Sequence, residues 1–372
     1  MRGSLVRIGV VLLLLSGLCA AAPRMAQAAE DKILNVYNWS DYIAADTLGK
    51  FTKETGIKVN YDVYDSNETL FAKLQAGQSG YDVVFPSASP FLAQGVRNKI
   101  FRPIERARLP HWSGLDSAIL KALDLADPGN QYGVPYLVAA TGIGYNIDKI
   151  KALIGGNDPP DSWSLLFDPK QVAKLKDCGV SLLDTSTEVF PAALVAAGHK
   201  GDSVAKDDIQ RAVDTVMKVR PFIKYFHSSK YINDLANGDT CVAHGYVGDL
   251  VQSRNRAREA GKGVHLRVYI PKEGAVLNVD VAAIPADAPH PMNAHLFIDF
   301  LMRPEIIADI TNTVGYANAV PAARALVRKD ILDDPAIYPP PAIAATEFEL
   351  PAATPEFERL RTRAWTKVKT GL

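Results

Sequence analysis

Acidic and aromatic side chains recur together where short apolar runs of the sequence end. A carboxylate in such a place is costly to bury unless a partner offsets its desolvation. Apolar runs are followed by Trp39-Ser40-Asp41-Tyr42, by Ser87-Ala88-Ser89 and by Tyr246-Val247-Gly248-Asp249, whereas Asp280 stands inside the otherwise apolar run 277–281. An organic polyammonium would be a suitable partner for such acids, because each charged end pairs with a carboxylate while aromatic rings cover the methylenes.

Each of these residues also has a plainer explanation. Trp39 could be a core residue, Asp41 or Asp249 could cap a helix, and Asp280 could pair with an arginine elsewhere in the chain. Taken singly, the plainer explanations are as good as the functional one. Taken together, the residues indicate a cleft that holds acids and rings.

Catalytic and metal motifs are missing from the sequence. There is no G-x-S-x-G, no H-E-x-x-H and no Walker loop, and no histidine pair at i, i+4. Ser203-Val204-Ala205-Lys206 and Lys369-Thr370-Gly371 match the motifs of exported β-lactam-recognising enzymes, but the first lies in a polar run and the second at the chain end. We therefore predict no enzyme, no cofactor and no metal, with a serine enzyme on Ser203 as an unfavoured alternative.

The elements that would position these residues alternate between strands and helices. The patterns predict strands at 33–37, 57–64 and 81–85, separated by helices at 46–55 and after a D-x-x-E capping box at 65–68. Further strands are expected at 142–145, 180–183 and 240–245, and helices at 208–219 and 293–302. This alternation is typical of α/β lobes with open sheets, whose ligands bind at the carboxyl ends of strands.

The N-terminus has the pattern of a secretory signal peptide. A basic start is followed by the apolar run 8–18 and by Ala26-Gln27-Ala28, an A-x-A cleavage site. A lipoprotein signal at Cys19 is disfavoured because Leu18 is not small. The whole chain carries 41 Lys+Arg and 41 Asp+Glu, so cleavage after Ala28, which removes only arginines, leaves a charge of −3. That balance argues against a nucleic-acid binder.

Cys178 and Cys241 would remain after export. An even pair of cysteines in an oxidising compartment favours a disulfide, with two buried free thiols as the alternative. Hydrophobic residues make up 48% of the chain and charged residues 22%, as in soluble globular proteins.

Long ordered strings of the sequence resemble the periplasmic polyamine-binding proteins, and among them the putrescine-binding branch. The strings include 38–43, 87–89, 141–146, 226–229, 231–239, 270–275 and 361–367. The resemblance implies a two-lobed periplasmic-binding-protein fold of type II, in which open mixed sheets flanked by helices enclose a cleft. It also implies the division 1–28 signal peptide, 29–138 and 279–322 first lobe, and 139–278 and 323–372 second lobe.

The same resemblance implies a ligand site and a disulfide. Its expected ligand-binding residues are Trp39, Ser40, Asp41, Tyr42, Ser87, Glu188, Tyr246, Asp249, Asn278, Asp280 and Tyr316, and the expected bridge joins Cys178 and Cys241. Three positions depart from the family pattern: Tyr246 replaces a tryptophan, Asn278 an aromatic residue, and Pro90 a phenylalanine or leucine.

We therefore expect a monomeric periplasmic protein that captures a small polyamine, putrescine first, and delivers it to the membrane permease of an ABC importer. The alternatives are spermidine, agmatine or a related cation as ligand, and a role as a sensor of the ligand.

Overall fold

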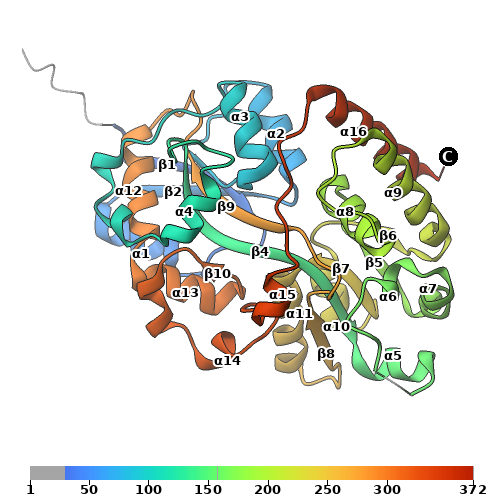
Figure 1. The fold of residues 1–372 in the computed structure, drawn as a ribbon. Helices are drawn as coiled ribbons and strands as arrows, with labels where there is room; N and C mark the ends of the chain where they lie inside the picture. Colours follow the sequence, from blue (N-terminus) through green and yellow to red (C-terminus); the bar gives the residue numbers. More distant parts are fainter. Residues whose placement is uncertain (1–29, 157, 372) are drawn as a thin grey trace, which may run out of the picture.

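The computed structural model describes residues 30–156 and 158–371. The predicted signal peptide and Cys19 lie outside the described residues. In the described part, the chain forms two groups of strands and helices. A long central strand, β4 (Gly133–Asn146), belongs to both groups, one at each of its ends (Figure 1). The α/β class predicted from the alternating pattern is confirmed.

The first lobe is built on one end of β4. Its strands run in the order β2-β1-β3-β9-β4, with β1, β2 and β3 parallel, β9 antiparallel to its neighbours, and β10 paired to β4. The strands are β1 (Ile33–Trp39), β2 (Lys58–Tyr64), β3 (Val83–Val84), β9 (Leu277–Ala283) and β10 (Ala317–Asn318). The helices are α1 (Thr47–Thr55), α2 (Asn67–Gln75), α3 (Ala93–Arg97), α4 (Ser117–Leu123), α12 (Pro291–Leu301) and α13 (Pro304–Val314).

The second lobe is built on the other end of β4. From Thr141 onward, β4 pairs with β7 and β8, and β5 lies between β7 and β6. The strands are β5 (Val180–Leu182), β6 (Tyr225–Phe226), β7 (Val242–Tyr246) and β8 (Leu266–Tyr269). The helices are α5 (Ile147–Ile154), α6 (Ser164–Phe167), α7 (Pro169–Leu175), α8 (Ser186–Ala196), α9 (Lys206–Val219), α10 (Tyr231–Asn237), α11 (Val247–Ala260) and α16 (Pro355–Thr370).

Two strands connect the lobes. β4 leaves the first sheet at Ala140, its last residue paired with β9, and enters the second at Thr141. β9 returns the chain to the first lobe, next to β4. After β10, the turn η6 (Pro321–Leu326) packs on α13, and α14 (Lys329–Leu332) and α15 (Pro341–Ala344) follow before α16 packs on α8 and α9 (Figure 1). The lobe boundaries near residues 138, 278 and 322 stay predictions.

Two local predictions need correction. The strand expected at 142–145 is only the end of β4, whose first half is continuous with it and equally apolar. The helix after residue 65 is capped by Ser66 rather than Asp65: the Ser66 hydroxyl accepts the Thr69 amide N–H at 3.2 Å. With Ser66 as the cap, the satisfied amide is that of Thr69, one residue beyond the Glu68 amide that an Asp65 cap would reach.

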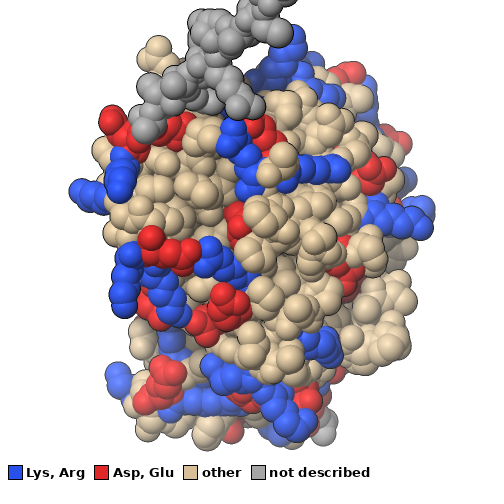
Figure 2. Space-filling view, turned by 90° about the vertical axis from the view of Figure 1, so that its left-hand side faces the viewer, with Lys and Arg blue, Asp and Glu red and all other residues tan. Residues whose placement is uncertain are grey.

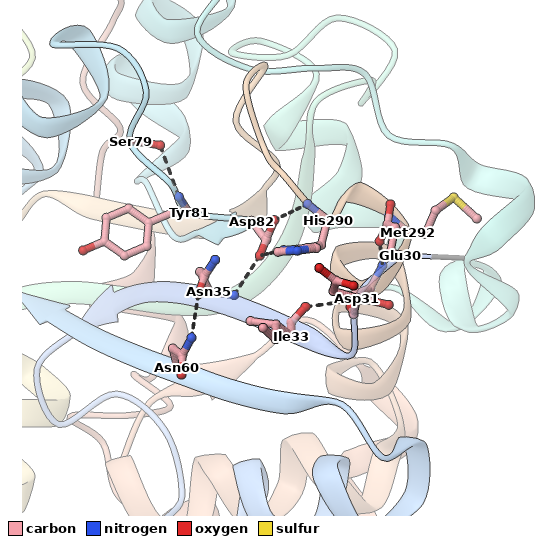
Figure 3. Close-up of polar contacts among 11 residues, drawn as sticks. Glu30, Asp31, Ile33, Asn35, Asn60, Ser79, Tyr81, Asp82, His290 and Met292 are labelled. Atoms are coloured by element: carbon pink, nitrogen blue, oxygen red, sulfur yellow. Dashed lines mark hydrogen bonds and ion pairs between the residues drawn. The ribbon is translucent and has the colours of Figure 1, made fainter. Parts of the chain in front are cut away.

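Two carboxylates, one buried and one partly buried, accept hydrogen bonds that hold the amino-terminal part of the first lobe in place (Figure 3). The Asp82 carboxylate is fully buried and accepts the backbone N–H of Asn35 at 2.7 Å and that of His290 at 2.6 Å. Glu30, the first described residue, accepts the Met292 N–H at 2.9 Å, so its charge lies at the positive N-terminus of α12. These contacts tie β1, β3 and α12 together.

The disulfide between Cys178 and Cys241 is present, with 5.6 Å between the Cα atoms, so the prediction of a bridge is confirmed. It joins the residues that precede β5 and β7, two adjacent parallel strands. The bridge therefore lies at the amino ends of these strands, whereas Tyr246 ends β7 at its carboxyl end.

Candidate functional site

A narrow cleft lies between the lobes, at the carboxyl ends of their parallel strands. Its walls are formed by Trp39, Ser40, Tyr42, Tyr64, Asp65, Ser87 and Ala139, and by Ser228, Ser229, Tyr246, Asp249, Asn278, Asp280 and Tyr316. The free space between these walls is about 20 Å³, room for one or two water molecules. A larger ligand can therefore enter only when the lobes move apart.

Asp280 is the acid of the first lobe. It stands in the middle of β9, and its backbone bridges to Ser87, which follows β3. The Tyr42 hydroxyl donates to Asp280 Oδ2 at 2.7 Å, and the Ser87 hydroxyl donates to Oδ1 at 2.6 Å. Both partners are neutral, so the carboxylate has hydrogen bonds but no counter-charge from them. Burial raises its pKa to about 6.

Asp249 is the corresponding acid of the second lobe. It lies in the first turn of α11, directly after β7, so the helix N-terminus faces its charge. The hydroxyl of Tyr231 donates to its Oδ2 at 2.7 Å and that of Tyr316 to its Oδ1 at 2.8 Å. Burial raises the pKa of Asp249 to about 7. Neither Asp249 nor Asp280 takes the plainer role of a helix cap or an arginine partner considered from the sequence.

Glu188 is a third buried acid, next to the cleft rather than on its wall. Asn278 Nδ2 donates to Glu188 Oε1 at 3.2 Å, while Oε2 is buried without a hydrogen-bond partner among the described residues. Burial raises the pKa of Glu188 to about 8. Asn278 thus connects this acid to the cleft wall, which it lines itself.

Aromatic rings close the space between the acids. The Trp39 ring lies 4.8 Å from the Tyr64 ring and 5.9 Å from the Tyr246 ring, centre to centre, and so faces a ring of each lobe. The Tyr42 and Tyr316 rings meet edge to face at 4.9 Å. The Trp39 indole N–H is held by the Phe85 carbonyl oxygen at 2.8 Å. Electron-rich faces beside buried carboxylates are suited to an organic cation.

Most of the expected ligand residues thus meet in one place, and two lie elsewhere. Asp41 is not on the wall: its Oδ1 accepts from Arg256 at 2.6 Å, across the lobes. Glu188 is reached only through Asn278. Pro90 is buried away from the lining.

Sequence reasoning missed five wall residues: Tyr64, Asp65, Ala139, Ser228 and Ser229. Tyr64 is the last residue of the predicted strand 57–64 and Asp65 follows it, so the rule applied to 39–42 could have found them. Ser228 and Ser229 stand in one of the quoted family strings, with one residue between them and the end of β6.

The enzymatic alternative has no support in the geometry. The Ser203 hydroxyl donates to the Asp208 carboxylate, and Lys206 Nζ pairs with Glu356 at 2.7 Å, so the two motif residues are engaged with different partners. Within residues 30–156 and 158–371, no group of three or more potential metal ligands is found. In the same part of the chain, no helix is both long and apolar enough to cross a bilayer.

The fold and the cleft define a two-lobed receptor that closes around a small solute. Residues 47–339 match the model of the bacterial extracellular solute-binding protein family, and the chain belongs to this family. It is 50% identical to the putrescine-binding periplasmic protein SpuD of Pseudomonas aeruginosa, over 98% of this chain and 99% of the relative. It is 51% identical to the putrescine-binding periplasmic protein PotF of Escherichia coli, over 96% and 98%.

A solved structure gives the same result for the fold. A putative spermidine/putrescine ABC transporter protein of Listeria monocytogenes superposes with a TM-score of 0.82 at 28% identity, covering 91% of this chain and 99% of its own. The predicted two-lobed fold is thereby confirmed. The chain is a periplasmic solute-binding protein and not an enzyme, as the sequence indicated.

Proposed function

We propose that the protein captures putrescine in the cleft between its lobes and delivers it to the membrane permease of an ABC importer. One observation carries the ligand class: Asp249 and Asp280 are buried on opposite sides of the cleft, and each receives only neutral hydroxyl donors. The cleft walls include no lysine or arginine among the residues described. An alkyl diamine supplies the two missing charges and an apolar middle for the rings.

In this proposal each lobe contributes one end of the site. Asp280, oriented by Tyr42 and Ser87, binds one ammonium; Asp249, oriented by Tyr231 and by Tyr316 of the first lobe, binds the other. Trp39 and Tyr246 cover the methylenes from the two lobes. Because the ligand touches both lobes, it stabilises the closed form, which is the form that a permease can distinguish from the open one. The relatives named for putrescine support this choice of diamine.

Agmatine is a second candidate, favoured by Glu188 and Asn278. The buried Glu188 Oε2 has no partner among the described residues, and Asn278 offers a further polar group beside the cleft. A guanidinium has more donors than an ammonium and could use both. A relative 41% identical to this chain is named as a putrescine/agmatine-binding protein.

The test is calorimetric titration of the ligand-stripped protein with putrescine, agmatine, cadaverine and spermidine. We expect one-to-one binding of putrescine, and Asp280→Asn should weaken it by roughly 30-fold or more, because a buried ammonium loses its charged partner. Asp207→Asn, at an exposed position of α9, is the matched control and should bind like wild type. Binding of none of the four, or equal binding by the Asp280→Asn variant, would reject the proposal.

A further inference from the structure

A second and larger cavity lies on the reverse face of the two connecting strands. Side chains alternate between the faces of a strand. Along β4, Ala139 lines the ligand cleft while Val138 and Ala140 line this second space; along β9, Asn278 lines the cleft while Leu277 and Val279 line the second space. We call it the hinge cavity. Its volume is about 500 Å³, against about 20 Å³ for the cleft.

The walls of the hinge cavity come from both lobes. From the first lobe it takes Ile119 and Ala122 of α4 and Ala317 of β10, and from the second lobe Val247 of α11 and Ile270 after β8. Figure 1 shows α4 and β10 next to β4. Cleft and cavity flank the same strands, so the rotation that opens the cleft brings the cavity walls together. An occupant of the cavity therefore favours the closed form.

Two glutamates give the cavity its charge. Glu347 and Glu349 both line it, and the residue between them is fixed by the backbone: Phe348 N–H donates to the Ala275 carbonyl at 3.0 Å, and the Leu277 N–H to the Phe348 carbonyl at 2.8 Å. Strand-like alternation places both carboxylates on the cavity side and the Phe348 ring on the other, against Gly201.

Neither glutamate has a positively charged partner among residues 30–156 and 158–371. Both side chains are partly buried, and burial alone raises the pKa of Glu347, to about 7, and that of Glu349. The one basic residue of the lining, Arg324, lies over the Tyr338 ring at 5.1 Å. Asp116, the third acid, accepts the Ala118 N–H at 2.7 Å and so caps α4. The lining thus combines broad apolar walls with two carboxylates that lack a counter-charge.

We propose that the hinge cavity is a second binding site for a small amphipathic cation, a primary alkylamine, and that its occupation strengthens ligand binding in the cleft. The hydrocarbon chain lies against the apolar walls, and the ammonium pairs with Glu347 and Glu349. Tyr316 connects the sites, because it lines both spaces and its hydroxyl donates to Asp249 at 2.8 Å. By linkage, each ligand should raise the affinity for the other by the same factor.

The probe is hexylamine. The control is hexanol, which has the same hydrocarbon chain but no charge. Hexylamine is titrated into the protein saturated with putrescine, followed by calorimetry and thermal unfolding. We expect saturable binding and a higher unfolding temperature, with no comparable effect of hexanol. Putrescine titrated at saturating hexylamine should bind several-fold more tightly.

Variants separate this site from the cleft. The double variant Glu347→Gln, Glu349→Gln should lower the affinity for hexylamine at least about tenfold. The control is the double variant Glu259→Gln, Glu305→Gln, at exposed positions, which should leave this affinity unchanged. Ala122→Trp should prevent hexylamine binding, because the larger side chain fills part of the hinge cavity. Hexylamine should also bind the ligand-stripped protein, with the same loss in the double glutamine variant, so the site can be assessed even if putrescine is not the cleft ligand.

The proposal would be overturned if hexylamine showed no saturable binding or competed with putrescine. It would also be overturned if hexanol bound as well as hexylamine, or if the double glutamine variant bound hexylamine like wild type. An unchanged affinity for putrescine at saturating hexylamine would overturn the coupling.

Discussion

The hydroxyl of Tyr316 donates to Asp249 Oδ1 at 2.8 Å and accepts the Asp249 backbone N–H at 3.2 Å, although the two residues belong to different lobes. Tyr316 precedes β10, which pairs with β4 in the first sheet, while Asp249 stands on α11 after β7 of the second. The Tyr316 ring also packs directly on Gly248, where any side chain would collide with it. This contact therefore connects Asp249, an acid of the cleft in the second lobe, to the sheet of the first lobe.

Removing the Tyr316 hydroxyl should therefore weaken ligand binding. Tyr316→Phe takes away one of the two hydroxyl donors that orient the Asp249 carboxylate, and we expect an affinity about tenfold lower, the value of one hydrogen bond to a charged group. Calorimetric titration with putrescine measures this affinity. Tyr132→Phe, at a partly buried tyrosine outside the cleft, should bind like wild type. An unchanged affinity in Tyr316→Phe would show that the hydroxyl does not orient the acid.

Ligand binding should strengthen as pH rises from 5 to 8. Burial raises the pKa of Asp280 to about 6 and that of Asp249 to about 7, so both are largely protonated at pH 5. An ammonium pairs with the ionised form, so binding releases protons until both acids are ionised. Titrations in buffers of different ionisation enthalpy measure the release. A pH-independent affinity would contradict the raised pKa values.

The same acids should affect the stability of the ligand-free protein in the opposite direction. Their pKa values are higher in the folded protein than in the unfolded chain, so the folded state binds more protons between about pH 4 and 7. The free energy of unfolding should then fall as pH rises through this window. Asp280→Asn should flatten the fall, whereas Asp207→Asn should retain it. Urea unfolding at pH 5, 6, 7 and 8 provides the measurement.

The acids and rings of the cleft could be found in the sequence because they follow predicted strands. Trp39, Ser87 and Tyr246 each stand where an apolar run ends, and strand ends meet at one edge of a sheet. Asp280 was visible for another reason, as an acid inside an apolar stretch. These signals are local, so one sequence is enough to read them.

Other features depend on contacts between distant parts of the chain. Nothing in the sequence near Asp41 indicates that its carboxylate forms an ion pair with Arg256, 215 positions later. The full length of β4 was missed because its first half has no alternation to separate it from other buried segments. The hinge cavity involves α4, β10 and the 347–349 segment at once, and no local pattern predicts that they meet.

Loss of the disulfide should destabilise the protein without weakening the site. The bridge closes a loop of 63 residues and should contribute roughly 4 kcal/mol by restricting the unfolded chain. It lies at the amino ends of β5 and β7, and neither cysteine lines the cleft. We expect Cys178→Ser with Cys241→Ser to unfold at lower urea but to bind putrescine as tightly as wild type below its transition. A large loss of affinity in the folded variant would mean that the bridge supports the cleft.

Breaking the ion pair between Arg256 and Asp41 should speed ligand release more than it slows capture. The pair forms at 2.6 Å between α11 and the segment after β1, so it joins residues of different lobes, which an opening of the cleft would separate. Both side chains remain partly exposed, which limits the contribution to about 1 kcal/mol or less. Arg256→Gln should therefore raise the dissociation rate of putrescine up to about fivefold in stopped-flow measurements. Arg258→Gln, on the exposed side of the same helix, is the control and should release at the wild-type rate. If Arg256→Gln also released at that rate, the pair would not stabilise closure, and Asp41 would have to be considered again as a ligand residue.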